Sequence, residues 1–267
     1  MSKNIELQKV RFVGLKAALG RMMTHPLVGH ALGSWFSDSI PSRGLRIDTR
    51  SDVTSAVKAM LFWGLYESAE IRFVQRFLRP GIDVVELGSS LGVVSCHIAR
   101  KIAQEARLLC VEANPRLGGI IVNNLAVNAP SVKAKVINAA IDYSSAESGT
   151  VRLNVGNTNL TSSVASGQNG CETLAIESTT LSRLLCEQGV EEYSLVADIE
   201  GAEIGILLHD RGALRRCRQI IAELHVSSSD GRTYSVEDLV RILTEECGYV
   251  LVARRGPVCV FELRERF

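Results

Sequence analysis

The stretch DVVELGSSLGVVS, residues 83–95, decides the fold of this chain. An apolar run with strand character ends on Glu86-Leu87, and Gly88 and Gly92 follow within a few residues. Because glycine adopts backbone angles that other residues rarely reach, this pattern predicts a buried strand, a sharp turn and then a helix. Ligands of open α/β sheets bind beyond the carboxyl ends of the strands, so we expect Glu86 to lie beside a ligand.

Strand-like and helix-like stretches alternate from about residue 80 onward. We predict strands at residues 83–87, 108–112, 134–141, 193–198, 219–225, 249–253 and 257–263. We predict helices between them at residues 91–105, 115–127, 180–188, 200–208 and 236–247. Strands separated by helices of this length indicate a parallel, doubly wound sheet. Only Arg254-Arg255-Gly256 separate the last two strands, which is too short for a crossover, so these strands should form an antiparallel hairpin.

The chain is predicted to consist of an N-terminal helical extension, residues 1–62, and a main domain, residues 63–267. Helical periodicity with basic residues such as Lys9 and Lys16 indicates an amphipathic helix near the N-terminus. A stretch rich in Gly, Ser and Pro, from Pro26 to Gly44, predicts a loop that interrupts the extension. We expect the N-terminal helix to pack on the main domain, and peripheral contact with a membrane or a partner is the alternative.

The composition limits the classes of partner. The 267 residues are 46% hydrophobic and carry a net charge of +1, which is enough apolar sequence for one large core and an extension. The near-neutral charge gives no general field for nucleic acid, so we expect no nucleic-acid partner. Seven cysteines without a C-x-x-C pair indicate reduced thiols and a cytoplasmic protein. No apolar run approaches the roughly 20 residues that span a bilayer, and no pattern indicates an oligomeric state.

The turn after the first strand indicates which cofactor the sheet holds. A dinucleotide fingerprint reads G-x-G-x-x-G, whereas the run Gly88-Ser89-Ser90-Leu91-Gly92 lacks the middle glycine. Glu86 would also direct a carboxylate at the space where a pyrophosphate should lie. Glu112 ends the second strand, where an acid can accept both hydrogen bonds of a ribose diol. A ribose and an ammonium group without a diphosphate describe S-adenosylmethionine, and a nicotinamide-dependent oxidoreductase remains a less favoured alternative.

These motifs resemble the FkbM-type family of S-adenosylmethionine-dependent methyltransferases. The resemblance runs from about Phe62 to the C-terminus and rests on Gly64–Glu67, Glu86–Gly92, Val111–Pro115, Asn124, Asn128, Asn138–Ile141, Asp198–Glu203 and Glu223–His225. The D-x-E-G-x-E run from Asp198 to Glu203 is its most specific motif. The resemblance implies a class I methyltransferase Rossmann-like fold. It also implies that the cofactor is bound by Glu67, Glu86, Gly88, Ser89, Ser90, Gly92, Glu112, Ala113 and Asp198.

The chain departs from the family pattern at three positions. The family usually has Asp in place of Glu86 and Asn in place of Ser90, and it commonly has Lys two residues before Asp198, where this chain has Val196. Because members are generally assigned to O-methylation, the resemblance implies methylation of a hydroxyl of a sugar, a glycan or another small metabolite. A relative that binds the cofactor without catalysis is the alternative that the missing lysine leaves open.

The candidate catalytic residues are Asp198, Glu200 and His225, which lie at or just after the ends of two neighbouring predicted strands. His225 is the preferred general base because an imidazole titrates near neutrality, and a purely structural hydrogen bond is the alternative. We expect Asp198 to orient cofactor or substrate. Glu200 either assists it or stabilises the first turn of the next helix, and Glu203 is expected on the helix surface. A metal site formed by these acids and His225 is an open alternative, but no tight ligand spacing supports one, so no metal is predicted.

Residues 154–170, NVGNTNLTSSVASGQNG, are almost all small and polar. A loop of this kind beside the crevice could close over the substrate, and an unstructured hairpin connection is the equal alternative. The scarcity of aromatic residues there argues against stacking of a nucleobase.

Overall fold

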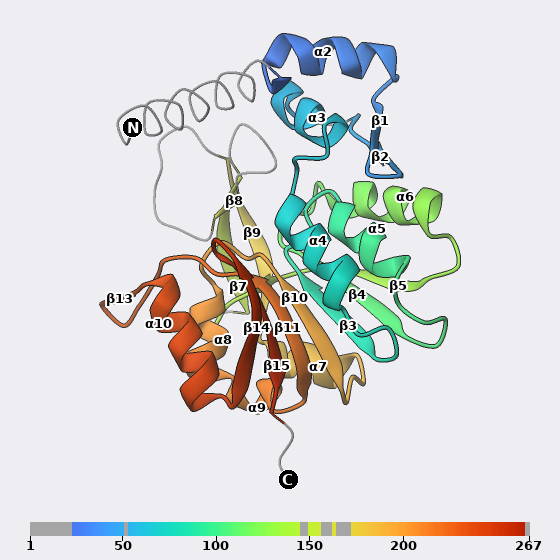
Figure 1. The fold of residues 1–267 in the computed structure, drawn as a ribbon. Coiled ribbons are helices and arrows are strands. Elements are labelled where there is room, and N and C mark those ends of the chain that lie inside the picture. The colour runs from blue at the N-terminus through green and yellow to red at the C-terminus, as the bar shows by residue number, and fades with distance from the viewer. Residues whose placement is uncertain (1–22, 51–52, 145–148, 156–161, 164–171, 265–267) are drawn as a thin grey trace, which may run out of the picture. The chain divides into compact units, whose positions relative to one another are not determined.

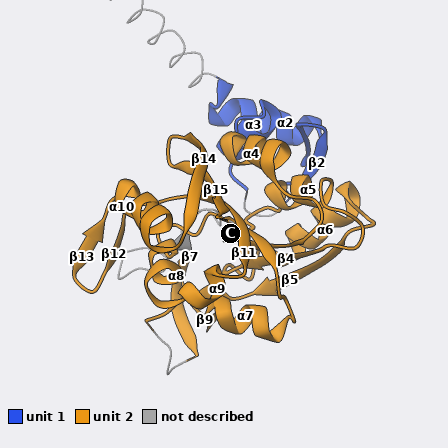
Figure 2. Cartoon of the chain, turned by 60° about the horizontal axis from the view of Figure 1, so that its bottom comes forward, with its two compact units in different colours: residues 1–66 blue, residues 67–267 orange. Residues whose placement is uncertain are grey.

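The computed structural model describes residues 23–50, 53–144, 149–155, 162–163 and 172–264 (Figure 1). The chain divides after Tyr66 into two compact units, residues 1–66 and residues 67–267 (Figure 2). The second unit holds every residue that the sequence assigns to the site. Among the described helices, none is both long and apolar enough to cross a membrane.

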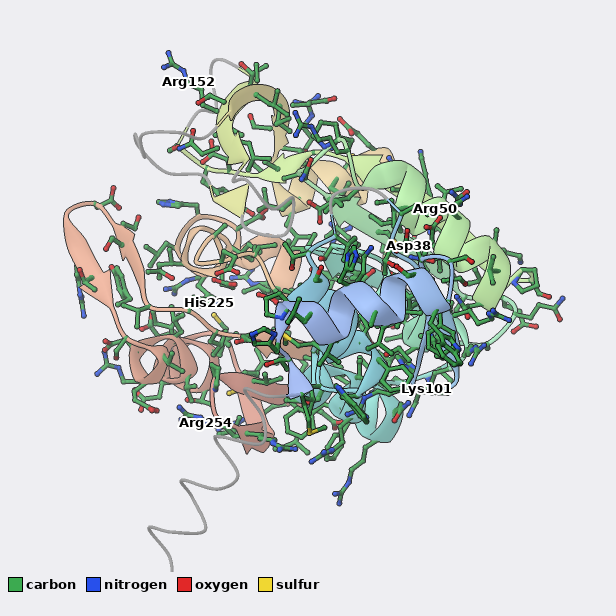
Figure 3. All side chains as sticks on the ribbon, turned by 90° about the horizontal axis from the view of Figure 1, so that it is seen from above. Asp38, Arg50, Lys101, Arg152, His225 and Arg254 are labelled. Carbon is green, nitrogen blue, oxygen red and sulfur yellow. The ribbon has the colours of Figure 1, made fainter. Side chains whose placement is uncertain are left out.

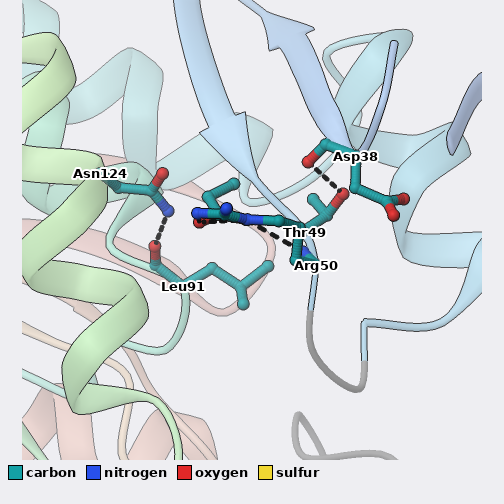
Figure 4. Close-up of polar contacts among 6 residues, drawn as sticks. Asp38, Thr49, Arg50, Leu91 and Asn124 are labelled. Carbon is teal, nitrogen blue, oxygen red and sulfur yellow. Dashed lines mark hydrogen bonds and ion pairs between the residues drawn. The ribbon is translucent and has the colours of Figure 1, made fainter. Parts of the chain in front are cut away.

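The first unit contains two helices and a β-hairpin among its described residues. In chain order these are α2 (Pro26–Trp35), β1 (Ser39–Ser42), β2 (Leu45–Asp48) and α3 (Ser55–Phe62), with β1 and β2 antiparallel. After the hairpin, Thr49 Oγ1 donates a hydrogen bond to the Asp38 carbonyl oxygen at 2.9 Å (Figure 4).

The predicted loop over residues 26–44 is wrong, because α2 and β1 occupy much of it. Pro26 is the first residue of α2, where its missing N–H would have no partner in any case. The side chain of His25 caps this helix by accepting a hydrogen bond from the Leu27 N–H at 3.3 Å. The helix predicted around Lys9 and Lys16 lies outside the described residues.

A seven-stranded sheet forms the centre of the second unit, in the order β14-β15-β11-β10-β3-β4-β5. Its strands are β3 (Asp83–Leu87), β4 (Arg107–Glu112), β5 (Lys133–Asn138), β10 (Tyr193–Ala197), β11 (Cys217–Glu223), β14 (Tyr249–Arg255) and β15 (Val258–Leu263). All neighbours from β5 to β11 are parallel, whereas β15 is antiparallel to both β11 and β14. The predicted parallel sheet with an antiparallel C-terminal hairpin is therefore confirmed.

The chain runs outward from β3 in two directions, first through β4 and β5 and later through β10 and β11. The switch point between β3 and β10 is where open α/β sheets bind their ligands, at the carboxyl ends of the strands. In register, Ala197 of β10 pairs with Leu87 of β3, so the residues that follow both strands leave the sheet side by side.

The helices of the second unit form two groups. One group is α4 (Ser68–Phe77), α5 (Val93–Ala99) and α6 (Gly118–Asn128), in which α5 packs between α4 and α6 (Figure 1). α4 also contacts β11 and β15, α5 contacts β4, and α6 contacts β5. The other group contains α7 (Leu181–Glu187), α8 (Glu203–His209), α9 (Arg211–Leu214) and α10 (Val236–Arg241). α10 continues as a π-helical turn, Ile242–Glu246. Residues of this second group share one core cluster with Val85 and Leu87 of β3. Because side chains alternate along a strand, Glu86 points to the opposite face, toward α5.

Several elements were not predicted from the sequence. A four-stranded sheet contains β6 (Ala140–Ile141), β7 (Thr150–Val155), β8 (Ser162–Ser163) and β9 (Glu172–Thr179), in the order β6-β9-β7-β8. A hairpin of β12 (Ser227–Ser229) and β13 (Arg232–Tyr234) follows β11. The strand predicted at residues 134–141 divides between the two sheets, and the proposed lid over residues 154–170 lies mostly outside the described residues.

Candidate active site

The turn after β3 depends on two glycines with positive φ, Gly88 at +83° and Gly92 at +75°. A Cβ atom added at Gly88 would lie 1.9 Å from the carbonyl oxygen of Asp198, so only glycine lets the turn pass the end of β10. A Cβ atom at Gly92 would lie 3.2 Å from the Cα atom of Ile121, so Gly92 allows close packing against α6. The sharp turn that the sequence predicted is therefore confirmed, and the close packing of Gly92 on α6 was not predicted.

The Glu86 carboxylate lies beneath this turn and is 2% exposed. Its Oε2 atom accepts hydrogen bonds from Ser89 Oγ at 2.9 Å and from Ser95 Oγ at 2.5 Å. Burial raises the pKa of Glu86 to about 7, although the two serine hydroxyls oppose the shift. The carboxylate therefore ties the turn to α5, and its predicted attraction for an ammonium group stays a prediction.

Val196, which replaces the family's common lysine, is fully buried in β10. It pairs in register with Glu86 on β3, and side chains of such pairs lie on the same face of the sheet. A lysine at this position would therefore lie beside Glu86, where Ser89 and Ser95 now donate their hydrogen bonds. The replacement changes the environment of Glu86, and it removes no residue from the group around His225.

Glu112 ends β4 and is 8% exposed. Its two carboxylate oxygens accept hydrogen bonds from the backbone N–H groups of Ser90 and Asn114, both at 2.8 Å. Burial raises the pKa of this carboxyl, while the N–H groups of Asn114, Ser90 and Ala113 act against the shift. The carboxylate is thus held rigidly between the turn after β3 and the turn after β4.

Side-chain amides fix the backbone around both turns. Asn138 Nδ2 donates to the carbonyl oxygens of Glu112 at 2.7 Å and of Ala113 at 3.0 Å. Asn124 Nδ2 donates to the Leu91 carbonyl oxygen at 2.8 Å (Figure 4). The asparagines of the sequence motif therefore hold the predicted cofactor loops in place, although they were not assigned to the site.

His225, which is labelled in Figure 3, lies among four carboxylates at the ends of β10 and β11. Its Nδ1 atom is 3.2 Å from Glu203 Oε1. Its Nε2 atom is 3.6 Å from Glu200 Oε2, 3.8 Å from Asp198 Oδ1 and 4.0 Å from Glu223 Oε1. The structure thus brings together the three predicted catalytic residues and adds two acids that the sequence did not assign to the site.

The surrounding acids shift the titration of this group. The hydrogen bond to Glu203, followed by the charges of Glu203, Asp198 and Glu200, raises the pKa of His225 to about 9. Burial and the charge of Glu223 raise the pKa of Asp198 to about 7. The charge of His225 acts against this shift. At neutral pH the free imidazole therefore holds a proton, so near-neutral titration no longer supports His225 as the general base.

Glu203 was expected on the helix surface, and that prediction is wrong. It is 4% exposed, and its Oε1 atom accepts a hydrogen bond from the Ile199 N–H at 3.2 Å besides contacting His225. Glu200 and Gly201 have positive φ values, +51° and +101°, so the chain turns before α8 begins at Glu203. Glu200 therefore lies in this turn and not in the first turn of a helix.

A further acid, Glu70 of α4, was also missed. It is 4% exposed, and burial raises its pKa well above the ordinary value, together with the charges of Glu67, Asp198, Glu86 and Glu223. Glu67, a predicted cofactor residue, precedes α4 with a positive φ of +45°. A charged residue beside Ile71, Phe73 and Val74 on the buried side of an amphipathic helix was the sequence signal for Glu70.

The described strands form a mostly parallel, doubly wound sheet with an antiparallel C-terminal hairpin, which is the arrangement of a class I methyltransferase Rossmann-like fold. The sequence profile of the methyltransferase FkbM domain matches residues 92–251. The chain therefore belongs to the FkbM methyltransferase family. A search of the curated proteins finds no match.

The solved structures that match this chain are distant in sequence. A protein of the NADB-Rossmann superfamily from Streptococcus agalactiae is 11% identical, with a TM-score of 0.43 and coverage of 74% of this chain and 69% of its own. A candidate tRNA (m1A22) methyltransferase from Streptococcus pneumoniae, in complex with S-adenosyl-L-methionine, is 16% identical, with a TM-score of 0.43 and coverage of 75% and 74%. A candidate O-methyltransferase from Klebsiella pneumoniae is 14% identical, with a TM-score of 0.42 and coverage of 88% and 97%.

Proposed function

We propose that this methyltransferase uses S-adenosylmethionine and methylates a hydroxyl group of a sugar, a glycan or another small metabolite. The observation that carries the proposal is the placement of Glu112 and the group around His225 at the carboxyl edge of one parallel sheet. Glu112 is the last residue of β4, on one side of β3, and Asp198 directly follows β10, on the other side. A cofactor at the switch point would thus lie between an anchored carboxylate and a second acidic group.

The residues around the switch point fit S-adenosylmethionine. Both Glu112 oxygens already accept one backbone N–H, and each carboxylate oxygen has a second lone pair for a ribose hydroxyl. The Gly88–Gly92 turn carries no side chain larger than Leu91, so its backbone can approach a ligand closely. The buried or half-buried acids Glu70, Asp198 and Glu203 favour a ligand with positive charge.

The acids around His225 are suited to hold and activate a hydroxyl acceptor. When it is bound, S-adenosylmethionine supplies a methyl group on a sulfonium, so the new C–O bond forms as the C–S bond breaks and the hydroxyl proton must leave. Asp198 and His225 lie close enough to contact one acceptor oxygen, because their nearest atoms are 3.8 Å apart. Correct alignment of acceptor and methyl group supplies about 7–11 kcal/mol in well-oriented systems.

Cofactor binding is the first test of this proposal. We expect S-adenosylmethionine and S-adenosylhomocysteine to raise the melting temperature of the purified chain, since a ligand of the native state stabilises it by mass action. NADH serves as the control, because the missing middle glycine and Glu86 disfavour a pyrophosphate. A thermal shift with NADH alone would indicate an oxidoreductase. A screen of sugars and hydroxylated metabolites with radiolabelled S-adenosylmethionine then tests methyl transfer itself.

Replacement of Glu112 by alanine should weaken cofactor binding by roughly 1.5–3 kcal/mol, the usual loss for hydrogen bonds to a charged group. The loss has two parts, because the variant leaves the ribose diol unpaired and also frees the N–H groups of Ser90 and Asn114. Glu112→Gln separates these parts, since its amide oxygen can still accept one hydrogen bond. Calorimetric titration of both variants measures the effect, and unchanged affinity in both would place the ribose elsewhere.

A further inference from the structure

Three side chains from the ends of β10 and β11 converge on one point. Asp198, Glu200 and His225 each offer one ligand atom, and these atoms all lie within 4.8 Å of one another. His225 Nε2 is 3.6 Å from Glu200 Oε2 and 3.8 Å from Asp198 Oδ1. Ligand atoms bound to a common cation at about 2.0–2.2 Å lie roughly 3–4 Å apart, so a cation fits between them with small side-chain adjustments.

Two buried oxygen atoms in this group point independently to a positively charged ligand. Asp198 Oδ1, which faces His225 Nε2, is buried and accepts no hydrogen bond among the described residues. Glu203 is 4% exposed and contacts His225 through Oε1, yet its Oε2 atom likewise accepts no hydrogen bond from the described residues. Buried carboxylate oxygens rarely remain without a donor, and a site for a cation is an established explanation of such exceptions.

The orientation of His225 also suits a ligand. Its Nδ1 atom is within hydrogen-bond distance of Glu203 Oε1, at 3.2 Å, which leaves Nε2 toward Asp198 and Glu200. Imidazoles that bind metals commonly donate their other ring N–H to a carboxylate, which fixes the tautomer and the ring plane. The positive φ values of Glu200 and Gly201 turn the chain so that the Glu200 carboxylate reaches the same point.

We propose that Asp198, Glu200 and His225 bind a divalent cation such as Mn²⁺ or Mg²⁺, with Glu203 orienting the histidine. Two carboxylates and one imidazole form a set of oxygen and nitrogen ligands suited to these ions, and they leave further positions for water or an acceptor. The role of the cation rests on the proposed function. It would bind the acceptor hydroxyl and lower its pKa, so that the proton leaves to solvent as the methyl group is transferred.

Manganese binding to the intact chain tests the proposal without an acceptor. We expect electron paramagnetic resonance to show one tight Mn²⁺ per chain in metal-free buffer, and we expect Mg²⁺ to displace it. Glu200→Gln and His225→Ala should each weaken Mn²⁺ binding at least tenfold. Glu200 is exposed, so its replacement should leave the fold intact, which a thermal melt checks. Glu245→Gln, which removes an exposed carboxylate elsewhere, is the matched control and should bind as the unaltered chain does.

The outcomes separate this proposal from the proposed function. Absence of a tight Mn²⁺ site, or equal Mn²⁺ affinity in all three variants, would overturn the metal site. Full methyl transfer in EDTA would also overturn its role while leaving the methyltransferase proposal intact. Tight Mn²⁺ binding that Glu200→Gln weakens, in a chain that binds no S-adenosylmethionine, would support the metal site and overturn the proposed function.

Discussion

Replacement of His225 by alanine should lower the rate of methyl transfer by roughly 10²- to 10⁴-fold while S-adenosylmethionine binds nearly normally. His225 lies among four carboxylates beyond the ends of β10 and β11, whereas Glu112 and the Gly88 turn lie on the other side of the switch point. The substitution therefore removes a group that acts on the acceptor and leaves the predicted cofactor contacts intact. Single-turnover kinetics and calorimetric titration together measure the two effects.

A matched control and the pH profile define the role of His225. His209→Ala removes an exposed histidine of α8 and should retain full activity. If the free imidazole is itself the base, the rate should rise as the pH passes through about 9, because only the deprotonated ring can take a proton. The His225→Ala variant should then lose that rise. Full turnover in His225→Ala would show that the residue does not act on the acceptor.

Replacement of Glu86 by glutamine should raise the free energy of unfolding, relative to the unaltered chain, more at alkaline pH than at acid pH. The folded state raises the pKa of Glu86 from 4.5 to about 7. Between these pH values Glu86 is therefore ionised in the unfolded chain and protonated in the folded chain. The free energy of unfolding of the unaltered chain should therefore fall as the pH rises from about 4.5 to about 7, by ~3 kcal/mol from this group. Glutamine carries no charge and removes this dependence, and it can still accept a hydrogen bond from Ser89 or Ser95.

Urea unfolding at pH 5 and pH 8, without cofactor, measures this difference. Burial also raises the pKa of Glu70, and the charge of Glu86 contributes to that shift. Loss of the Glu86 charge lowers the pKa of Glu70, so the Glu70 contribution changes the comparison in the same direction and does not oppose it. Glu245→Gln is the control, because it removes an exposed carboxylate and should leave the pH dependence unchanged. Parallel stability curves for the unaltered chain and Glu86→Gln would contradict the burial argument for Glu86.

The central sheet could be predicted because its strands carry strong local signals. The strand at residues 83–87 was placed correctly, and the short gap Arg254-Arg255-Gly256 correctly predicted the antiparallel hairpin. The second sheet was missed, although Val151 and Leu153 alternate with polar residues in β7 as a half-buried strand requires. The small polar residues after β7 were interpreted as a loop.

The site could be predicted only in part, since its members meet through tertiary structure. The acids that end the strands were found because parallel strands place their carboxyl ends at one edge. Glu203 was misplaced because helical spacing alone cannot show that the positive φ values of Glu200 and Gly201 delay the start of α8. Several points stay predictions. They are the ligand roles of the site residues, the absence of a nucleic-acid partner, the cytoplasmic location and the domain boundary.

The position of β15 in the sheet has a consequence for synthesis of the chain. β15 is the last of the described strands, yet it lies between β11 and β14 and pairs with both. While the ribosome has not yet released Val258–Leu263, β11 therefore presents an open edge and β14 has no partner in the sheet. Unpaired edges of this kind bind other chains readily, so the nascent protein is prone to aggregation until β15 has emerged.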